Sequence, residues 1–281
     1  MKFNLGKLGK ALGPVIAIVL AAGASGCDGK VSFNGGDGKP LAELDMSGAA
    51  PQELVLAGPD EVHVTTGDKL AITVEGDPAV KDELRFSIKD GSLAIHRKDK
   101  MFGSGDKVAI INVTMPALRE VVMAGSGKIV TANLASKAEV TVAGSGTIES
   151  NAIAGESLDL TIAGSGNFRG AGNVKSLDMT IAGSGSAAMD ALRVDKADVS
   201  IAGSGDAAFS SDGEVDASIM GSGSVTVKGR ARCTVSSMGS GKLVCESGVT
   251  QKDEKDEDKP APPAAPPAAP PAPEAPATPK P

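Results

Sequence analysis

The tripeptide Gly-Ser-Gly recurs along the chain at nearly constant spacing. Successive copies lie 19, 20, 19, 20, 18 and 18 residues apart and begin at Gly125, Gly144, Gly164, Gly183, Gly203, Gly221 and Gly239. A further copy at Gly103, 22 residues before the first, is less regular. This period is too short for paired-helix repeats, which need roughly 33 residues, and it suits one turn of a β-solenoid.

Alignment on this tripeptide brings apolar residues into columns at alternate positions, which is the pattern of strands with one buried face. Before the glycines, one column contains Val142, Ile162, Ile181, Ile201 and Ile219, and a second contains Val140, Leu160, Met179, Val199 and Ala217. After the glycines, another strand contributes Ile129, Ile148, Phe168, Ala187, Ala207, Val225 and Leu243. A third short segment ends in Leu134, Ile153, Val174 and Leu192.

The pattern predicts an all-β fold, a right-handed parallel β-helix with about 18–20 residues per coil, regular over residues 121–247. Glycine at each corner tolerates positive φ and leaves room for coils stacked about 4.8 Å apart. Residues 41–120 carry strand-like runs separated by turn residues such as Asp90-Gly91. We expect them to form irregular N-terminal coils that continue or cap the helix.

Residues 41–247 are similar to a known family of bacterial envelope proteins, the putative auto-transporter adhesin head GIN domain family. The resemblance rests on the Ile-Ala-Gly-Ser-Gly repeats, on Leu93-Ala94-Ile95 after Asp90-Gly91, and on residues 113–118 leading into residues 122–127. It implies an exported or lipidated protein with a right-handed parallel β-helix and a role in adhesion. It brings no catalytic residues.

The N-terminus has the features of an export signal. Lysines at positions 2, 7 and 10 precede an apolar stretch over residues 11–22, which is shorter than the roughly 20 residues of a membrane span. Ala24-Ser25-Gly26-Cys27 resembles the bacterial lipobox, whose cysteine becomes the acylated (palmitate-type) first residue of the mature lipoprotein. We predict a signal peptide over 1–26, a membrane anchor on Cys27 and a flexible linker over 27–40. An ordinary secretory signal with an incidental cysteine is the alternative.

The C-terminal segment differs sharply in composition from the repeats. Residues 252–259 are almost all charged, and residues 260–281 are nearly all proline and alanine. Such a segment cannot bury enough apolar surface to fold. We therefore predict a disordered tail over residues 248–281, either without a partner or serving as a spacer or docking strip.

Two groups of side chains are candidate sites. Cys233 and Cys245 occupy inward columns of the last coil, where an oxidising compartment permits a disulfide; two buried thiols are the alternative. An outward column of carboxylates lies beside a Thr/Ser column and consists of Glu139, Asp159, Asp178, Asp198 and Asp216. Their mutual repulsion would be relieved by a hard cation such as Ca²⁺, whereas a solvated face partly neutralised by Lys137 and Lys196 is the simpler interpretation.

Composition limits the function classes. The net charge of −7 disfavours nucleic acid as a partner, because no Lys/Arg stripe is present to neutralise phosphates. No zinc spacing, nucleotide loop or serine-nucleophile elbow occurs, so we expect no catalysis and no resident cofactor. The leading hypothesis is an adhesin-like envelope lipoprotein that binds an unknown envelope or extracellular ligand. A periplasmic scaffold and a polysaccharide-active enzyme are the alternatives, and the oligomeric state and membrane leaflet stay open.

Overall fold

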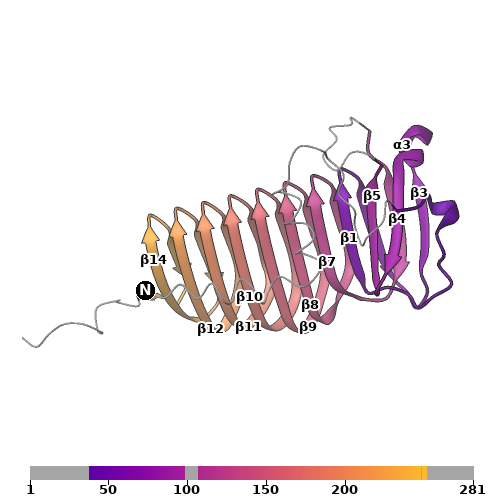
Figure 1. Cartoon of the computed structure of the whole chain (residues 1–281). Helices are drawn as coiled ribbons and strands as arrows, with labels where there is room; N and C mark the ends of the chain where they lie inside the picture. Colours follow the sequence, from indigo (N-terminus) through magenta and orange to yellow (C-terminus); the bar gives the residue numbers. More distant parts are fainter. Residues whose placement is uncertain (1–37, 99–106, 248, 252–281) are drawn as a thin grey trace, which may run out of the picture.

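The computed structural model describes residues 38–98, 107–247 and 249–251. The predicted signal peptide, Cys27, the irregular Gly-Ser-Gly at Gly103 and the tail beyond Gln251 lie outside these ranges. The described chain forms a column of stacked β-coils, as predicted (Figure 1).

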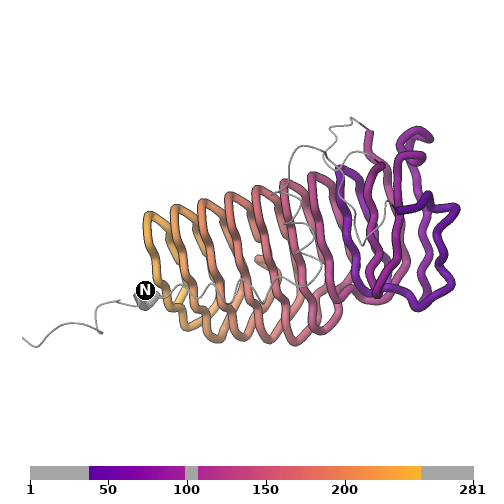
Figure 2. The backbone as a smooth tube through the Cα atoms, viewed as in Figure 1, coloured from indigo at the N-terminus to yellow at the C-terminus, as the bar shows by residue number. Residues whose placement is uncertain are grey.

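Long parallel strands make up the regular part of the column. Each pairs with the next in chain order: β7 (Leu118–Gly125), β8 (Lys128–Gly144), β9 (Thr147–Gly164), β10 (Asn167–Gly183), β11 (Ser186–Gly203) and β12 (Asp206–Gly221). The last coils consist of β13 (Ser224–Lys228), β14 (Arg232–Gly239), β15 (Lys242–Cys245) and β16 (Val249–Gln251). Between β7 and β12 the strand assignment breaks only at the Ser-Gly of each corner, so one strand runs through most of a coil (Figure 2).

Glycine is required at the corners because the coils approach each other backbone to backbone. Gly164 has a φ of +117°, and a Cβ added there would lie 2.6 Å from the carbonyl oxygen of Gly144 in the preceding coil. The backbone N–H of Ser165 donates to that same oxygen at 2.9 Å. The hydrogen bond that stacks one corner on the next therefore occupies the space that any side chain would need.

The core runs along the inside of the column. All four inward columns predicted from the alignment are buried, with exposed fractions of 9 % or less. The register confirms the three strand columns, but the column of the third short segment is less regular than predicted. Val174 pairs with Val194, whereas Leu192 pairs with Gly172, because the register of β10 and β11 shifts between Arg169 and Ala171.

The N-terminal region contributes two further coils whose spatial order differs from their order in the chain. β1 (Glu53–Gly58) and β2 (Glu61–Thr66) stack directly on β7 and β8. β5 (Ser92–Arg97) and β6 (Ile110–Met115), which follow later in the chain, stack on the opposite side of β1 and β2. The chain thus first forms the coil next to β7 (β1 and β2). It then forms the coil beyond that one (β5 and β6) and returns to form β7.

Two antiparallel strands cover the outer end of the column. β4 (Leu84–Lys89) pairs with β5, and β3 (Ala71–Glu75) pairs with β6. A short helix, α3 (Pro78–Glu83), joins β3 to β4, and Figure 1 shows it at this end of the molecule. These elements protect the exposed sheet edge, as the sequence analysis expected of this region.

Several local features were missed by the sequence analysis. Helix α3 begins at an Asp77 N-cap, whose carboxylate accepts the N–H of Ala79, followed by proline at the first helical position. At the two ends, the predicted linker and tail are too long by a few residues. Lys39 already pairs with Phe86, and a 3-10 turn, η1 (Leu41–Glu43), follows; β16 extends the ordered coils to Gln251.

Candidate binding face

The predicted carboxylate column is present and is longer than predicted. Seven side chains stand opposite one another on successive strands: Glu53, Glu120, Glu139, Asp159, Asp178, Asp198 and Asp216. We call this row the acidic ladder. The sequence analysis missed Glu53 and Glu120, although each lies five residues before a corner glycine, as the other five do.

Two further columns accompany the acidic ladder on the same outward side of the sheet. A hydroxyl column contains Thr141, Thr161, Thr180, Ser200, Ser218 and Ser236. An alanine column contains Ala124, Ala143, Ala163, Ala182 and Ala202, and it continues in the last coils as Met220 and Met238. We call the three columns together the ladder face. It is a surface on which the same chemistry repeats at every coil.

Electrostatic repulsion is built into the acidic ladder because its members lie about one strand spacing apart. Two carboxylates about 4.8 Å apart repel by roughly 0.9 kcal/mol in water. Burial, with the charges of Glu139 and Glu53 on either side, raises the pKa of Glu120 to about 7. Burial and the neighbouring Asp178 also raise the pKa of Asp159. Glu120 therefore keeps its proton to a higher pH than a solvent-exposed glutamate does.

The carboxylates of the ladder lie in a line and do not converge on one point. Across residues 38–98, 107–247 and 249–251, no three His, Cys, Asp or Glu side chains form a group able to hold a metal ion. The predicted Ca²⁺ site thus lacks a convergent set of ligands among these residues. Lys137, expected to neutralise the ladder, pairs instead with Glu156 at 3.3 Å.

A buried ion pair that the sequence analysis missed holds the two N-terminal coils together. The Arg97 guanidinium donates to both carboxylate oxygens of Asp60, at 2.9 and 2.6 Å, and also to the carbonyl of Lys107 at 2.8 Å. The Asp60 carboxylate in addition accepts the N–H of Ala109. Only 5 % of the Arg97 side chain and 1 % of the Asp60 side chain are exposed. Asp60 ends the corner Gly58-Pro59-Asp60, which stacks beneath Gly125 but lacks the Gly-Ser-Gly signature.

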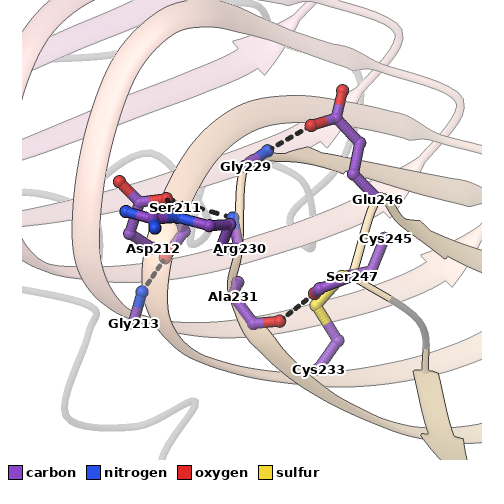
Figure 3. The surroundings of a disulfide bond; sticks show 10 residues. All are labelled: Ser211, Asp212, Gly213, Gly229, Arg230, Ala231, Cys233, Cys245, Glu246 and Ser247. Carbon is purple, nitrogen blue, oxygen red and sulfur yellow. Dashed lines mark hydrogen bonds and ion pairs between the residues drawn. A yellow bond between two sulfur atoms is a disulfide. The ribbon is translucent and has the colours of Figure 1, made fainter.

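Cys233 and Cys245 are joined as a disulfide in the structure (Figure 3). Cys233 stands opposite Val215 and Cys245 opposite Val227, so both continue inward columns of the preceding coil. Their Cα atoms are 6.6 Å apart, which lies within the range that disulfides span. Beside them the Ser247 hydroxyl donates to the carbonyl of Ala231 (Figure 3). These contacts tie β15 to β14 at the C-terminal end of the column.

Cys27 and its predicted acyl chains fall outside the described residues. In the part of the chain that the structure describes, no helix is both long enough and apolar enough to cross a bilayer.

Solved structures of low sequence identity share this fold. A protein from Bacteroides fragilis, described as a putative adhesin, is 18 % identical with a TM-score of 0.58, covering 72 % of this chain and 92 % of its own. A putative lipid binding protein from Parabacteroides distasonis is 23 % identical with a TM-score of 0.56, covering 70 % and 93 %. A putative adhesin from Parabacteroides merdae is 21 % identical with a TM-score of 0.52, covering 70 % and 92 %. The comparison with curated proteins gave no match.

A family model matches residues 50–231, which is most of the solenoid. This range begins just before β1 and ends just before β14, so it takes in both the capped N-terminal coils and the Gly-Ser-Gly coils. The chain belongs to the family described as "putative auto-transporter adhesin, head GIN domain".

Proposed function

We propose that this protein is a non-catalytic envelope protein, anchored to a membrane through Cys27, that binds its partner through the ladder face. The observation that carries the proposal is the ladder face itself, on which carboxylates and hydroxyls repeat in register over the length of the column. Family membership supports an adhesin-like role at the cell envelope.

The chemistry of the ladder face indicates a partner with repeated positive charges or hydrogen-bond donors. A single exposed ion pair contributes only about 0–1 kcal/mol. A ladder offers the same contact at each coil, so a partner with matching repeats gains from many weak contacts made together. A cationic strip on another envelope polymer or protein fits this description, whereas nucleic acid does not, because both surfaces would be negative.

The location is tested by protease treatment of intact cells followed by mass spectrometry of the solenoid. Adhesion requires that peptides from residues 121–247 disappear while a periplasmic control protein stays intact. If the solenoid survives until the envelope is opened, adhesion is ruled out and a periplasmic scaffold becomes the function to test. Labelling with a fatty-acid analogue, in the wild type and in Cys27→Ser, tests the anchor separately.

The binding surface is tested with polylysine as a model cationic partner on a sensor surface. One variant neutralises three ladder residues (Asp159→Asn, Asp178→Asn, Asp198→Asn). A charge-matched control neutralises three carboxylates elsewhere (Glu43→Gln, Glu156→Gln, Glu214→Gln). We expect the ladder variant to lose at least ten-fold more binding than the control. Equal losses would mean that net charge alone governs binding, and the ladder face would then have no special role.

A further inference from the structure

A pocket lies on the side of the column, at the third segments of three successive coils. Its lining includes Asp190, Ala191 and Arg193 of β11, Ser210 and Asp212 of β12, and Lys228 of β13, and we call it the step pocket. Its volume is about 230 Å³. Pockets for drug-sized ligands measure roughly 300–1,000 Å³, so the step pocket suits one small ring. It lies outside the ladder face.

The step pocket exists because the coils change length at this point. The corners at Gly183 and Gly203 are 20 residues apart, whereas the next two intervals are 18 residues each. The register of β11 on β12 skips residues 190–192, which have no counterpart on β12. The longer coil therefore forms a step beside the two shorter ones, and the pocket lies at this step.

A row of three side chains crosses the step pocket. Arg193, Ser210 and Lys228 stand opposite one another on the three coils. A small serine between two long cationic side chains leaves room for a ligand above it. The Ser210 hydroxyl donates to the carbonyl of Asp190 at 2.9 Å, so its oxygen is still able to accept a hydrogen bond.

Two carboxylates balance the two cations of the row. Lys228 Nζ lies 2.8 Å from Asp190 Oδ1, two coils away. Arg193 Nη2 donates to Asp212 Oδ2 at 2.8 Å, and the same carboxylate accepts the backbone N–H of Arg230 at 3.0 Å (Figure 3). The Lys228 ammonium lowers the pKa of Asp190, and the Arg230 N–H lowers the pKa of Asp212. Both carboxyls are therefore ionised at neutral pH.

This balance of charge favours a neutral ligand. A charged ligand of either sign gains a counter-charge only by breaking one of the ion pairs. A neutral ligand leaves them in place, because an ionised carboxylate accepts several hydrogen bonds and a guanidinium or ammonium donates several. Donors and acceptors thus alternate around one small pocket. A hydroxyl group both donates and accepts, so a ring that carries several hydroxyls uses both kinds.

We propose that the step pocket binds one neutral sugar ring of a glycan. The sugar hydroxyls bond to Asp190, Arg193, Ser210 and Lys228, and the Ala191 methyl group meets the C–H face of the ring. The site is separate from the ladder face, so it functions whether or not the acidic ladder binds a cationic partner.

Saturation-transfer NMR tests the ligand class on the full-length protein, extracted in a detergent that carries no sugar. The probes are the methyl glycosides of glucose, galactose, mannose and N-acetylglucosamine, with methyl glucuronide as the anionic comparison. We expect at least one neutral glycoside to bind with a Kd at least five-fold lower than that of methyl glucuronide. Binding by none of the neutral glycosides would overturn the proposal. Tighter binding of the glucuronide than of all four would show an anion site and overturn it too.

A matched pair of variants tests the location. Ala191→Phe fills the step pocket without a change in charge, and Ala188→Phe, at another exposed position of β11, is the control. We expect at least ten-fold weaker binding in Ala191→Phe and wild-type binding in Ala188→Phe. Equal binding in the two variants would place the sugar elsewhere and refute the site.

Asp190→Ala covers the case in which the bulky phenylalanine disturbs the coil. It removes an exposed ion pair, which contributes only about 0–1 kcal/mol to stability, and it removes an acceptor from the pocket. We expect at least three-fold weaker glycoside binding with the melting temperature of the wild type. Unchanged binding would contradict the proposed contact.

Discussion

Replacement of Glu120 by glutamine should make the protein more stable at alkaline pH, with a gain that shrinks as the pH falls toward 4.5. Burial and two neighbouring carboxylates raise the pKa of Glu120 from 4.5 to about 7 in the folded protein. A carboxyl with a raised pKa favours folding most below its unfolded pKa, and this advantage disappears as the pH rises through the folded value. Above pH 7 the folded protein must therefore hold an ionised Glu120 that is better solvated in the unfolded chain.

The size of the effect follows from the two pKa values. A difference of about 2.5 corresponds to about 3.4 kcal/mol at 1.36 kcal/mol for each pKa unit. Because the carboxyl keeps partial contact with solvent, screening reduces this, and we expect about 1–2 kcal/mol. Glu120→Gln keeps the shape of the side chain and removes the charge. It should gain that amount at pH 8 and only about a quarter of it at pH 5, just above the unfolded pKa.

Urea unfolding of the wild type and Glu120→Gln at pH 5, 6, 7 and 8 measures the difference directly. Glu43→Gln, at an exposed position in η1, is the matched control and should follow the wild type throughout. If Glu120→Gln loses stability with pH as steeply as the wild type, the acidic ladder does not destabilise the fold. A loss of stability at pH 8 would show that the ionised carboxylate has a stabilising partner.

Three further substitutions test the corners, the buried ion pair and the disulfide. Gly164→Ala should cost at least about 3 kcal/mol in thermal unfolding, because φ strain adds to a clash with the preceding coil. Gly91→Ala, with a φ of +85° but nothing within 4 Å, isolates the φ strain and should cost only about 1–2 kcal/mol; equal losses would refute the stacking argument. Arg97→Met leaves the carboxylate of Asp60 buried without its partner and should cost about 3–5 kcal/mol by urea unfolding, whereas a loss below 1 kcal/mol would show that water replaces the guanidinium. Cys245→Ser opens a short loop and should cost about 3 kcal/mol, measured as a lower melting temperature that reduction of the wild type reproduces; a wild-type melting temperature unaffected by reductant would contradict this.

The regular coils were predictable because every coil has the same two structural requirements. A corner that stacks on its predecessor requires glycine, and a strand with one buried face requires alternation, so both appear at a fixed period in the chain. The same spacing predicted that Cys233 and Cys245 follow Val215 and Val227, as the register shows. Glu120 also obeys this spacing, and a wider search of the period would have found it.

The contacts of the N-terminal coils have no such period. Asp60 and Arg97 are 37 residues apart, and nothing in their neighbourhoods indicates that they meet. The corner at Gly58 is separated from Gly125 by the chain that forms β2 to β7, and it uses Pro-Asp where the others use Ser-Gly. Helix α3 has a start signal in Asp77-Pro78, an N-cap followed by proline, which the sequence analysis did not use.

The sequence by itself determined the solenoid, its coil length, the inward columns and most of the acidic ladder, because residues one coil apart are neighbours in both sequence period and space. Only the tertiary structure decided that β5 and β6 stack outside β1 and β2 and that Asp60 pairs with Arg97. These features depend on contacts between segments that are far apart in the chain. Packing of this kind leaves no periodic trace in the sequence.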